Sequence, residues 1–520
     1  MKAKSACLII NPRSGENLAK LNDVLAVLSA AGWDADVFIK EYGGHTLELA
    51  KNAGKQKYDL VIAYGGDGTL NQVVNGVMYT NKKSSSVGLL PGGTANEWAN
   101  EVGIPVDPVK SALSLINSRA RRVDVGHITV EGLTFPPTAG ESTSDTSSTP
   151  AASSNGAPSL KKRKTTTNAR QDFLMMAGLG IDAAVMGHVS KPLKYHIGPI
   201  AVGLSAAYEL PKQHPFPVEI RVTASNGEEG QAWKGEALQV VVSNTRKYAD
   251  VIEMSPDAYI DDGSLDVTVI TASDSITTMQ QIMSLVFRRK PDSLTAEVLH
   301  GSSLHISAPA SIAMQLDGTA VKLQDYLSKK DRTALKDAID PSQVMVTYRF
   351  DAVPRSLSVA IPCSYNDALF ESAEDQSNDH ANGAQQADTK PTNAAGQEEQ
   401  AQTSQVGEQA DQEQGEQAGQ SDPLAIPAPL KRGRKVRVIG ASHNPDKQKP
   451  LYVIAGSAIK SSTGEFSPVA VRVNGKTTVL HRTGGAAPLD DIEKLPEGVE
   501  IAVEGKKSKR GVIVARQVVI

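Results

Sequence analysis

The sequence contains only two cysteines among its 520 residues, Cys7 and Cys363, and they lie far apart. Cys7 falls in an apolar run, so neither a disulfide framework nor a cysteine-rich metal site is expected, and a reducing compartment is the simpler interpretation. Long apolar runs are also missing, since none approaches the roughly 18 residues that a membrane-spanning helix requires. The first eleven residues pass from two lysines to Pro12 with too few apolar residues for a signal sequence. We therefore expect a cytoplasmic protein whose membrane contacts are peripheral.

An excess of charge of one sign is lacking as well. The 54 lysines and arginines nearly balance the 58 aspartates and glutamates, which leaves a formal net charge of -4. This balance argues against general nucleic-acid binding through bulk charge, so partners must be sought in local clusters. A chain of 520 residues is too long for one ordinary core, and two or more domains with linkers are expected.

Strand-like and helical patterns alternate in the first part of the chain. Short apolar runs that indicate buried strands lie at residues 7–10, 35–39, 60–64 and 87–90. Apolar residues recur at helical spacing at residues 18–28, 70–77 and 109–116. This alternation is typical of an α/β domain, in which nucleotides usually bind where the strands end. We predict an α/β nucleotide-binding domain over residues 1–125.

The pattern then changes to short β runs, which predict a mainly β second domain over residues 126–365. Apolar residues at helical spacing predict one helix at residues 276–286. Residues 135–170 are rich in Ser, Thr, Pro and Ala and predict a disordered insertion. The basic cluster at residues 161–164 fits a solvated linker better than a localisation or lipid-binding signal.

The last part of the chain divides into a linker and a third unit. Residues 366–430 are dominated by Gln, Glu, Asp, Ala and Gly, so we predict an extended, acidic, disordered linker. Alternating runs return over residues 431–520 and suit a small β-barrel of the oligonucleotide/oligosaccharide-binding type. Its basic start at residues 431–435 could touch nucleic acid or phospholipid, but few aromatic residues are present as stacking platforms. A protein-contact or accessory role is therefore favoured over nucleic-acid binding.

Three turns that can bind phosphate lie at strand ends in the first domain. In Gly65-Gly66-Asp67-Gly68-Thr69, three glycines surround one carboxylate between a predicted strand and a predicted helix. Residues without a Cβ let backbone N–H groups approach an anion, and the helix dipole favours it. Alone, such a run could equally be only a tight turn. Asn11-Pro12-Arg13-Ser14-Gly15 and Pro91-Gly92-Gly93-Thr94-Ala95-Asn96 are turns of the same kind, and three together point to a kinase.

In combination these motifs resemble the diacylglycerol kinase catalytic family, which includes sphingosine kinases and bacterial lipid kinases. The resemblance covers most of residues 4–362 and includes residues 176–182, Asn244 and residues 256–266. It implies an α/β ATP-binding domain followed by a mainly β sandwich domain, with ATP in the cleft between them. The implied reaction transfers the γ-phosphoryl group of ATP to the hydroxyl of diacylglycerol or a related lipid. Such a substrate implies peripheral membrane contact.

The resemblance also implies roles for individual residues. Nucleotide contacts are implied for Asn11, Gly65, Gly66, Asp67, Gly68, Thr69, Asn71 and Thr94. Asp67 is the carboxylate best placed to act through Mg²⁺ or to orient the acceptor hydroxyl, although an aspartate here can also simply cap the turn. A structural Mg²⁺ is implied at the Asp257 carboxylate and the carbonyls of Met254 and Tyr259, where oxygen ligands suit a hard cation. Pro256-Asp257-Ala258 can also be an ordinary turn.

The clearest departure from the family pattern lies at Asp317-Gly318-Thr319. The family usually has Asp-Gly-Glu, and that glutamate is assigned as the proton acceptor. A threonine hydroxyl cannot accept a proton at neutral pH as a carboxylate does, so either Asp317 or Asp67 is the catalytic carboxylate or turnover is slow. A base of this kind contributes about 10²- to 10⁴-fold.

Two smaller departures are Lys40, where a nucleotide-contacting threonine is common, and Ala249-Asp250, which replace a glycine pair. Lys40 could compensate by meeting phosphate charge. His45 is isolated, and a position at a helix start or on the surface fits it better than catalysis.

Two alternatives to a lipid kinase remain open. NAD kinases share the Gly-Gly-Asp-Gly-Thr loop, although residues 91–99 resemble the lipid kinases more closely. A nucleotide- or lipid-binding regulatory protein with weak or lost turnover would fit Thr319 and the added C-terminal domain. The sequence favours catalysis.

Overall fold

The computed structural model describes the chain in thirteen segments: residues 5–15, 17–80, 85–136, 170–180, 215–223, 228–248, 252–271, 296–338, 340–371, 433–444, 450–459, 466–508 and 512–520. The predicted helix at residues 276–286 lies outside these segments. So do nearly all of the predicted insertion at residues 135–170 and most of the predicted linker at residues 366–430.

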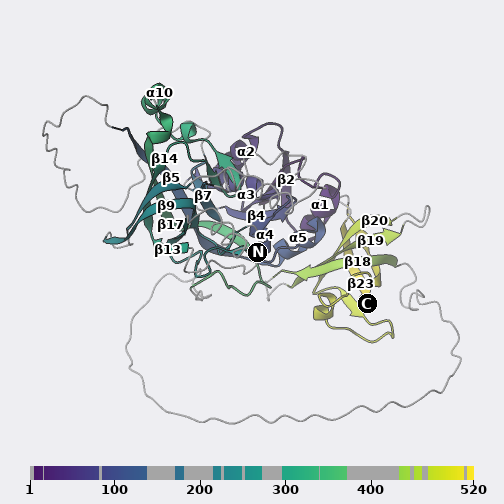
Figure 1. The fold of residues 1–520 in the computed structure, drawn as a ribbon. Helices are drawn as coiled ribbons and strands as arrows, with labels where there is room; N and C mark the ends of the chain where they lie inside the picture. The colour runs from purple at the N-terminus through teal and green to yellow at the C-terminus, as the bar shows by residue number, and fades with distance from the viewer. Residues whose placement is uncertain are drawn as a thin grey trace, which may run out of the picture. The chain divides into compact units, whose positions relative to one another are not determined.

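A parallel sheet organises the first domain (Figure 1). Its strands are β1 (Ser5–Ile10), β2 (Asp34–Ile39), β3 (Leu60–Gly65) and β4 (Ser86–Pro91), which pair in the order β4-β3-β1-β2. Every residue of β3 and β4 is buried. Burial of both strand faces is typical of parallel sheets, because crossover helices cover them, and it explains the continuous apolar runs in the sequence.

Helices cover both faces of this sheet. On one face, α2 (His45–Gln56) and α3 (Asp67–Met78) share a core with odd-numbered strand residues such as Ile9 and Ala63. On the other face, α1 (Leu21–Ala30) and α5 (Pro108–Ile116) share a core with even-numbered residues such as Leu8 and Ile62. Successive strand residues point to opposite faces, so each strand contributes to both cores. The short helix α4 (Glu97–Glu101) follows β4.

Two long strands run through both the first and the second domain. β5 (Ser118–Thr134) and β17 (Met345–Pro362) pair antiparallel, with a register shift between Val353 and Leu357. On one side of this shift β17 pairs with β4, and on the other side it pairs with β14 (Ser303–Pro309). The predicted domain boundary at residue 125 therefore falls inside β5, and a single hydrogen-bonded sheet continues through both domains.

The second domain is mainly β, as predicted. Its further strands are β6 (Asp172–Phe173), β7 (Met176–Gly180), β8 (Phe216–Thr223), β9 (Glu229–Ser243), β12 (Leu265–Thr271), β13 (Ala296–Gly301), β15 (Met314–Leu316) and β16 (Thr319–Val321). They pair in the order β16-β15-β7-β9-β8-β14-β17, with β12 on β9 and β13 on β12. A separate hairpin joins β10 (Lys247–Tyr248) to β11 (Ile252–Glu253).

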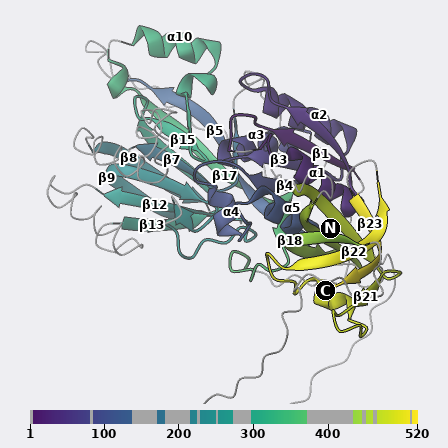
Figure 2. The same cartoon turned by 90° about the vertical axis from the view of Figure 1, so that its right-hand side faces the viewer.

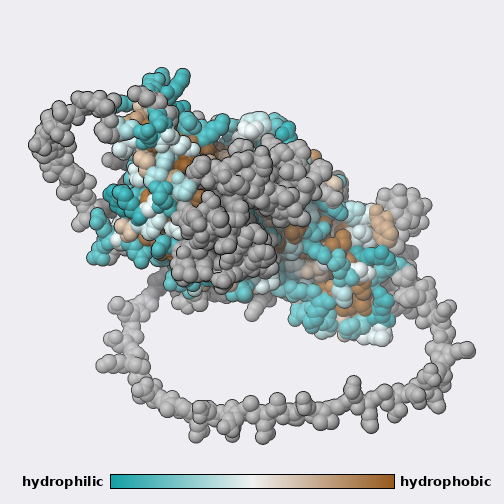
Figure 3. Space-filling model, in the orientation of Figure 1, coloured by the Kyte–Doolittle hydropathy of each residue, from teal (hydrophilic) through white to brown (hydrophobic). Residues whose placement is uncertain are grey.

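One helix of the second domain is almost entirely polar. In α10 (Lys329–Asp337) only Leu335 is buried, and the Ser328 hydroxyl caps the helix by accepting a bond from the Asp331 N–H (3.2 Å). Figure 3 shows hydrophilic side chains over this helix. No helix in the part of the chain that the structure describes is long and apolar enough to cross a bilayer.

The C-terminal region forms a closed β-barrel, as predicted. Its strands are β18 (Arg434–His443), β19 (Leu451–Ile459), β20 (Phe466–Asn474), β22 (Glu500–Lys507) and β23 (Val512–Val519), and β21 (Thr478–Leu480) is added at one side. The order β18-β19-β20-β23-β22 returns to β18, with β20 and β23 parallel. In Figure 2, β22 lies between β18 and β23, with which it pairs. Five strands closed in this manner suit the oligonucleotide/oligosaccharide-binding type.

Candidate active site

The three predicted phosphate turns come together at the ends of parallel strands. We call residues 11–15 the first turn, residues 65–69 the second turn and residues 91–96 the third turn. The second and third turns touch backbone to backbone, because a Cβ built on Gly66 would stand 2.8 Å from the Cα of Gly93. The N–H of Gly92 also donates to the carbonyl of Gly65 (3.0 Å). Only glycines permit this approach, which explains why both runs are rich in glycine.

The first turn is attached to the other two by side chains and backbone. Asn11 Nδ2 donates to Ser14 Oγ (2.7 Å) and to Thr69 Oγ1 (3.4 Å), so it joins the first turn to the second. Gly15 has a left-handed φ of +53°, and a Cβ on it would stand 3.0 Å from the carbonyl oxygen of Gly92. The structure therefore places Asn11 and the second and third turns, including Thr94, in one cluster.

Asn17 supports this cluster, although it was not among the predicted site residues. Its side chain is buried (1% exposed), and its Nδ2 donates to the carbonyls of Tyr64 (3.1 Å) and Asn11 (3.3 Å). A Cβ on Gly92 would overlap its Oδ1. In the sequence Asn17 is simply a polar residue just after the first turn. That feature is too common to identify a supporting residue on its own.

Asp67 is the first residue of α3, and its carboxylate lies beside the start of α4. Its Oδ1 accepts a hydrogen bond from the N–H of Trp98 (3.3 Å). Burial raises the pKa of Asp67, and the Asp317 carboxylate raises it further, whereas backbone N–H groups of residues 67, 97 and 98 oppose the rise. A carboxylate whose pKa is raised is a stronger base when it is ionised.

Asp317 is held far more tightly than Asp67. It is 2% exposed, and its two oxygens accept four hydrogen bonds. The donors are Asn71 Nδ2 (2.8 Å) and the N–H groups of Leu174 (2.9 Å), Met175 (2.9 Å) and Met176 (3.1 Å). Burial raises the pKa of Asp317, while these donors lower it. The arrangement favours a positioning role for Asp317, and its catalytic role stays a prediction.

A polar seam on α3 connects this helix to the second domain. Asn71 is fully buried, and besides Asp317 its Nδ2 contacts the carbonyl of Asp172 (3.0 Å). Asn75, one turn later, donates to the same carbonyl (2.8 Å) and accepts from the N–H groups of Gln171 (2.9 Å) and Asp172 (3.0 Å). Asn75 was not among the predicted site residues, although its spacing of four residues from Asn71 puts both amides on one helix face.

Thr319 begins β16 immediately after the Asp317-Gly318 turn and faces the second turn. A Cβ built on Gly68 would stand 3.2 Å from Thr319 Oγ1. Thr319, the residue that departs from the family motif, therefore lies beside the predicted phosphate-binding loop. Of the other departures, Lys40 follows β2, and Ala249-Asp250 lie outside the described segments.

His45 begins α2, as the sequence favoured. Its Nδ1 accepts a hydrogen bond from the Glu41 N–H (3.1 Å), and its ring stacks on Tyr42 at 4.5 Å between centroids. Both interactions are local to the start of the helix.

The predicted structural magnesium ligands lie in one turn after β11. Asp257 is exposed there, while the carbonyl of Met254 accepts a bond from Thr268 Oγ1 (3.0 Å). The guanidinium of Arg246 lies over the Tyr259 ring at 4.8 Å. Within the described segments no three His, Cys, Asp or Glu side chains gather around a common metal position, so a cation here would depend on one carboxylate and backbone carbonyls. An all-oxygen donor set of this kind fits Mg²⁺.

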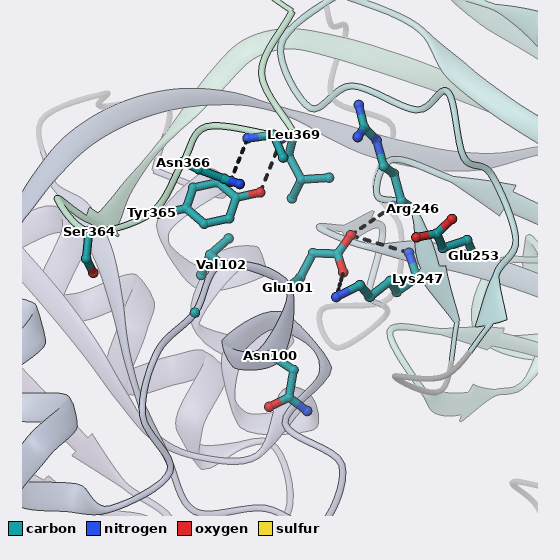
Figure 4. A pocket seen from close by; sticks show the side chains of 12 residues that line it. Asn100, Glu101, Val102, Arg246, Lys247, Glu253, Ser364, Tyr365, Asn366 and Leu369 are labelled. Atoms are coloured by element: carbon teal, nitrogen blue, oxygen red, sulfur yellow. Dashed lines mark hydrogen bonds and ion pairs between the residues drawn. The ribbon is translucent and has the colours of Figure 1, made fainter. Parts of the chain in front are cut away.

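A cavity of about 460 Å³ lies at the end of α4, and none of the predicted site residues lines it (Figure 4). Its buried carboxylate belongs to Glu101, whose Oε1 accepts from the N–H groups of Arg246 (3.1 Å) and Lys247 (3.3 Å). Lys247 Nζ lies 3.9 Å from Oε2. Burial raises the pKa of Glu101, and Lys247 opposes the rise. Glu101 thereby connects α4 to the β10–β11 hairpin.

Glycine-containing turns at the ends of parallel strands, with an aspartate at a helix start and a β domain facing them, are typical of kinases that hold nucleotide phosphates. Comparison with known families supports this class. Residues 5–128 match the model described as diacylglycerol kinase catalytic domain. Residues 176–326 match the model described as YegS C-terminal NAD kinase beta sandwich-like domain. Residues 5–128 therefore belong to the diacylglycerol kinase catalytic family, and the two matches together support a kinase-type enzyme.

Individual relatives are similar over most of their own length. A diacylglycerol kinase of Bacillus subtilis is 29% identical over 270 residues, which are 51% of this chain and 74% of that protein. One of Staphylococcus carnosus is 26% identical over 318 residues, 61% of this chain and 88% of that protein. A solved structure of a putative diacylglycerol kinase from Bacillus anthracis covers 71% of this chain and 100% of its own, at 20% identity and a TM-score of 0.48.

Proposed function

We propose that this protein is an ATP-dependent lipid kinase that transfers the γ-phosphoryl group to a hydroxyl of diacylglycerol or a related lipid. The observation that supports this most directly is the convergence of the three turns, in which Gly66 meets Gly93 while Asp67 stands at the start of α3. The names of the relatives, all diacylglycerol kinases, favour diacylglycerol as the acceptor.

In this proposal the chain contributes mainly position and charge. Phosphoryl transfer needs little covalent chemistry from the protein, because alignment and neutralisation of developing charge lower the barrier. Backbone N–H groups of the second and third turns hold the phosphates, with Asn11 and Thr94 at their edges. Mg²⁺, when bound, neutralises phosphate charge. Asp67 is the residue that would hold it or orient the acceptor hydroxyl.

The remaining polar residues position these groups. Asp317 and Asn71 fix the β15–β16 turn against α3 through their mutual hydrogen bond (2.8 Å), and this turn presents Thr319 to Gly68. Because residue 319 offers no carboxylate, Asp67 would accept the proton of the lipid hydroxyl. A structural Mg²⁺ at Asp257 with the carbonyls of Met254 and Tyr259 is part of the same proposal.

An acceptor assay tests the function. Purified protein would be incubated with γ-labelled ATP and Mg²⁺ against vesicles of diacylglycerol, sphingoid base or phosphatidylglycerol, and separately against NAD. We expect label in diacylglycerol or another lipid. Label in NAD alone would favour an NAD kinase. That outcome is included because the family model of the second domain is described as NAD kinase beta sandwich-like. ATP binding without any transfer, beside an active control enzyme, would indicate a regulatory protein.

Membrane contact is the second part of the proposal. A lipid acceptor requires a cytoplasmic enzyme to meet the bilayer surface, and we propose peripheral docking. Flotation with vesicles that contain diacylglycerol tests it, and recovery of all protein in the lipid-free fraction would contradict it.

A further inference from the structure

Strands of the barrel bury apolar side chains on both of their faces, whereas an isolated barrel would bury them only in its interior. On β19, Tyr452 and Ile454 point into the barrel core, but the alternate residues Val453 and Ala455 are also buried, at 0% and 2% exposed. Ala470 on β20 and Val512 on β23 belong to the same outer set, at 0% and 4%. Adjacent residues of a strand point to opposite faces, so something outside the barrel covers these four side chains.

The cover is supplied by the first domain. The four outer side chains share one hydrophobic core with residues of α1 and α5, such as Val27 and Leu113. A Cβ built on Gly440 of β18 would stand 3.1 Å from a methyl carbon of Leu113. At the edge, Lys110 Nζ forms an ion pair with Glu497 (2.7 Å). In barrels of the oligonucleotide-binding type the second and third strands carry the ligand face, and here these are β19 and β20.

Arg472 makes the most specific contact. It lies on β20 between inward-pointing Val471 and Val473, so its side chain points outward with Ala470. Its Nε donates to the carbonyl of Ala30 (2.6 Å), and an Nη donates to the carbonyl of Ser29 (2.7 Å). These carbonyls belong to the last turn of α1, at the negative end of the helix dipole, and the Ser29 carbonyl also accepts the Gly32 N–H (3.0 Å). Arg472 therefore caps α1 from the barrel.

Helix α1 leads directly to the phosphate cluster. It begins at Leu21, four residues after Asn17, whose amide supports the first turn and fills the space under Gly92. A helix is a stiff element, so fixing its end restricts the segment at its start.

We propose that the barrel is an intramolecular docking partner of the kinase domain, which uses its β19–β20 face to hold α1 and thereby fixes the first turn for nucleotide binding. Arg472 is the positioning residue. The oligonucleotide-type face is then occupied by the protein's own kinase domain. The nucleotide part of this proposal rests on the proposed function, whereas the docking part does not.

The test uses the full-length chain with Arg472→Met, which keeps an unbranched side chain and removes the guanidinium. Its control is Arg437→Met, because Arg437 lies on β18, is 53% exposed and pairs with Glu500 of the barrel itself. We expect the Kd for ATP, measured by calorimetry, to rise about 2- to 30-fold for Arg472→Met. Arg437→Met should leave it unchanged, and Arg472→Lys should give an intermediate value because it keeps the charge.

Hydrogen exchange separates docking from nucleotide binding. In Arg472→Met we expect faster exchange of the amides of residues 11–30, with the exchange of the barrel interior unchanged. A Kd equal to wild type together with unchanged exchange would overturn the proposal. No ATP binding by the wild type would contradict the proposed function alone, and the exchange result would still decide the docking. Tight binding of a single-stranded oligonucleotide by the wild type would overturn the assignment of this face.

Discussion

The hydroxyl oxygen of Thr319 would stand 3.2 Å from a Cβ on Gly68, so the residue that departs from the family motif faces the predicted phosphate-binding loop. The backbone at this position is set by the Asp317-Gly318 turn, in which both residues have left-handed φ values, +44° and +67°. A longer side chain at residue 319 would therefore project toward the second turn.

Restoring a carboxylate at this position should raise the rate. We expect Thr319→Glu to increase kcat for lipid phosphorylation by about 10²-fold, the lower end of what a positioned base contributes. The assay is initial-rate transfer of labelled phosphate to diacylglycerol. Ala320→Glu adds the same charge at the next, exposed position and should give no increase. A Thr319→Glu enzyme no faster than wild type would show that the missing carboxylate does not limit turnover.

Replacing Asp67 tests its role as the catalytic carboxylate. Asp67→Asn keeps an oxygen that can accept from the Trp98 N–H, so the fold should persist. We expect kcat to fall by at least about 10²-fold, while the affinity for ATP without metal changes little. Initial rates and calorimetric ATP binding would be compared with wild type. Full activity in Asp67→Asn would remove Asp67 from the mechanism.

Asp317 should matter for stability as much as for rate. In Asp317→Asn an NH₂ group replaces one oxygen and faces backbone N–H donors, which leaves buried donors without an acceptor. We expect the free energy of unfolding to fall by about 2 to 4 kcal/mol in urea titrations. Asp257→Asn, at an exposed position, serves as the control in metal-free buffer and should change it by less than about 0.5 kcal/mol. A stable but inactive Asp317→Asn protein would instead favour a direct catalytic role.

The free energy of unfolding should depend on pH through the protonation of Asp262. Burial raises the pKa of Asp262 to about 6, helped by Asp124 and Asp266 and opposed by the Ser264 N–H and by His300. The folded state thus binds this proton more tightly than the unfolded chain, whose aspartates titrate near about 4. The protonated Asp262 carboxyl therefore adds to the free energy of unfolding. The addition is complete below about pH 4 and is lost as the pH rises to about 6.

Asp262→Asn removes that titration and keeps an oxygen for the Ser264 N–H. Relative to wild type, the variant should therefore gain stability between about pH 4 and pH 6. Urea unfolding at both pH values measures the difference. Parallel curves for the two proteins would contradict the assignment.

Local sequence signals predicted the elements of the fold well, for a physical reason. Buried strands such as β3 are continuous apolar runs, and the turns that follow them need glycine, so both features are visible in a few neighbouring residues. The alternation of β22 and β23 likewise indicated the barrel. These signals depend only on which faces of an element are covered.

The partners of buried polar residues could not be predicted in this way. The hydrogen bond between Asn71 and Asp317 joins residues 246 positions apart, and the sequence around either residue does not indicate its partner. The covering of Val453 and Ala455 presents the same difficulty. A continuous apolar run indicates that both faces of the strand are buried, but it does not indicate which part of the chain covers them. Long-range pairing is a property of the assembled fold.

The ribbon formed by β5 and β17 limits how the enzyme can move. Many two-domain enzymes close on their substrates by bending a few loop residues, but here backbone hydrogen bonds run from one domain into the other. Rotation of the domains would have to shear or break that ladder, whose register shifts between Thr347 and Tyr348 and again between Val353 and Leu357, where Arg355 has a left-handed φ of +43°. Relative motion of the two domains is therefore expected to be a small flexing about this bulge, and in the proposed lipid kinase the access of the acceptor would depend on loops and side chains rather than on swinging domains.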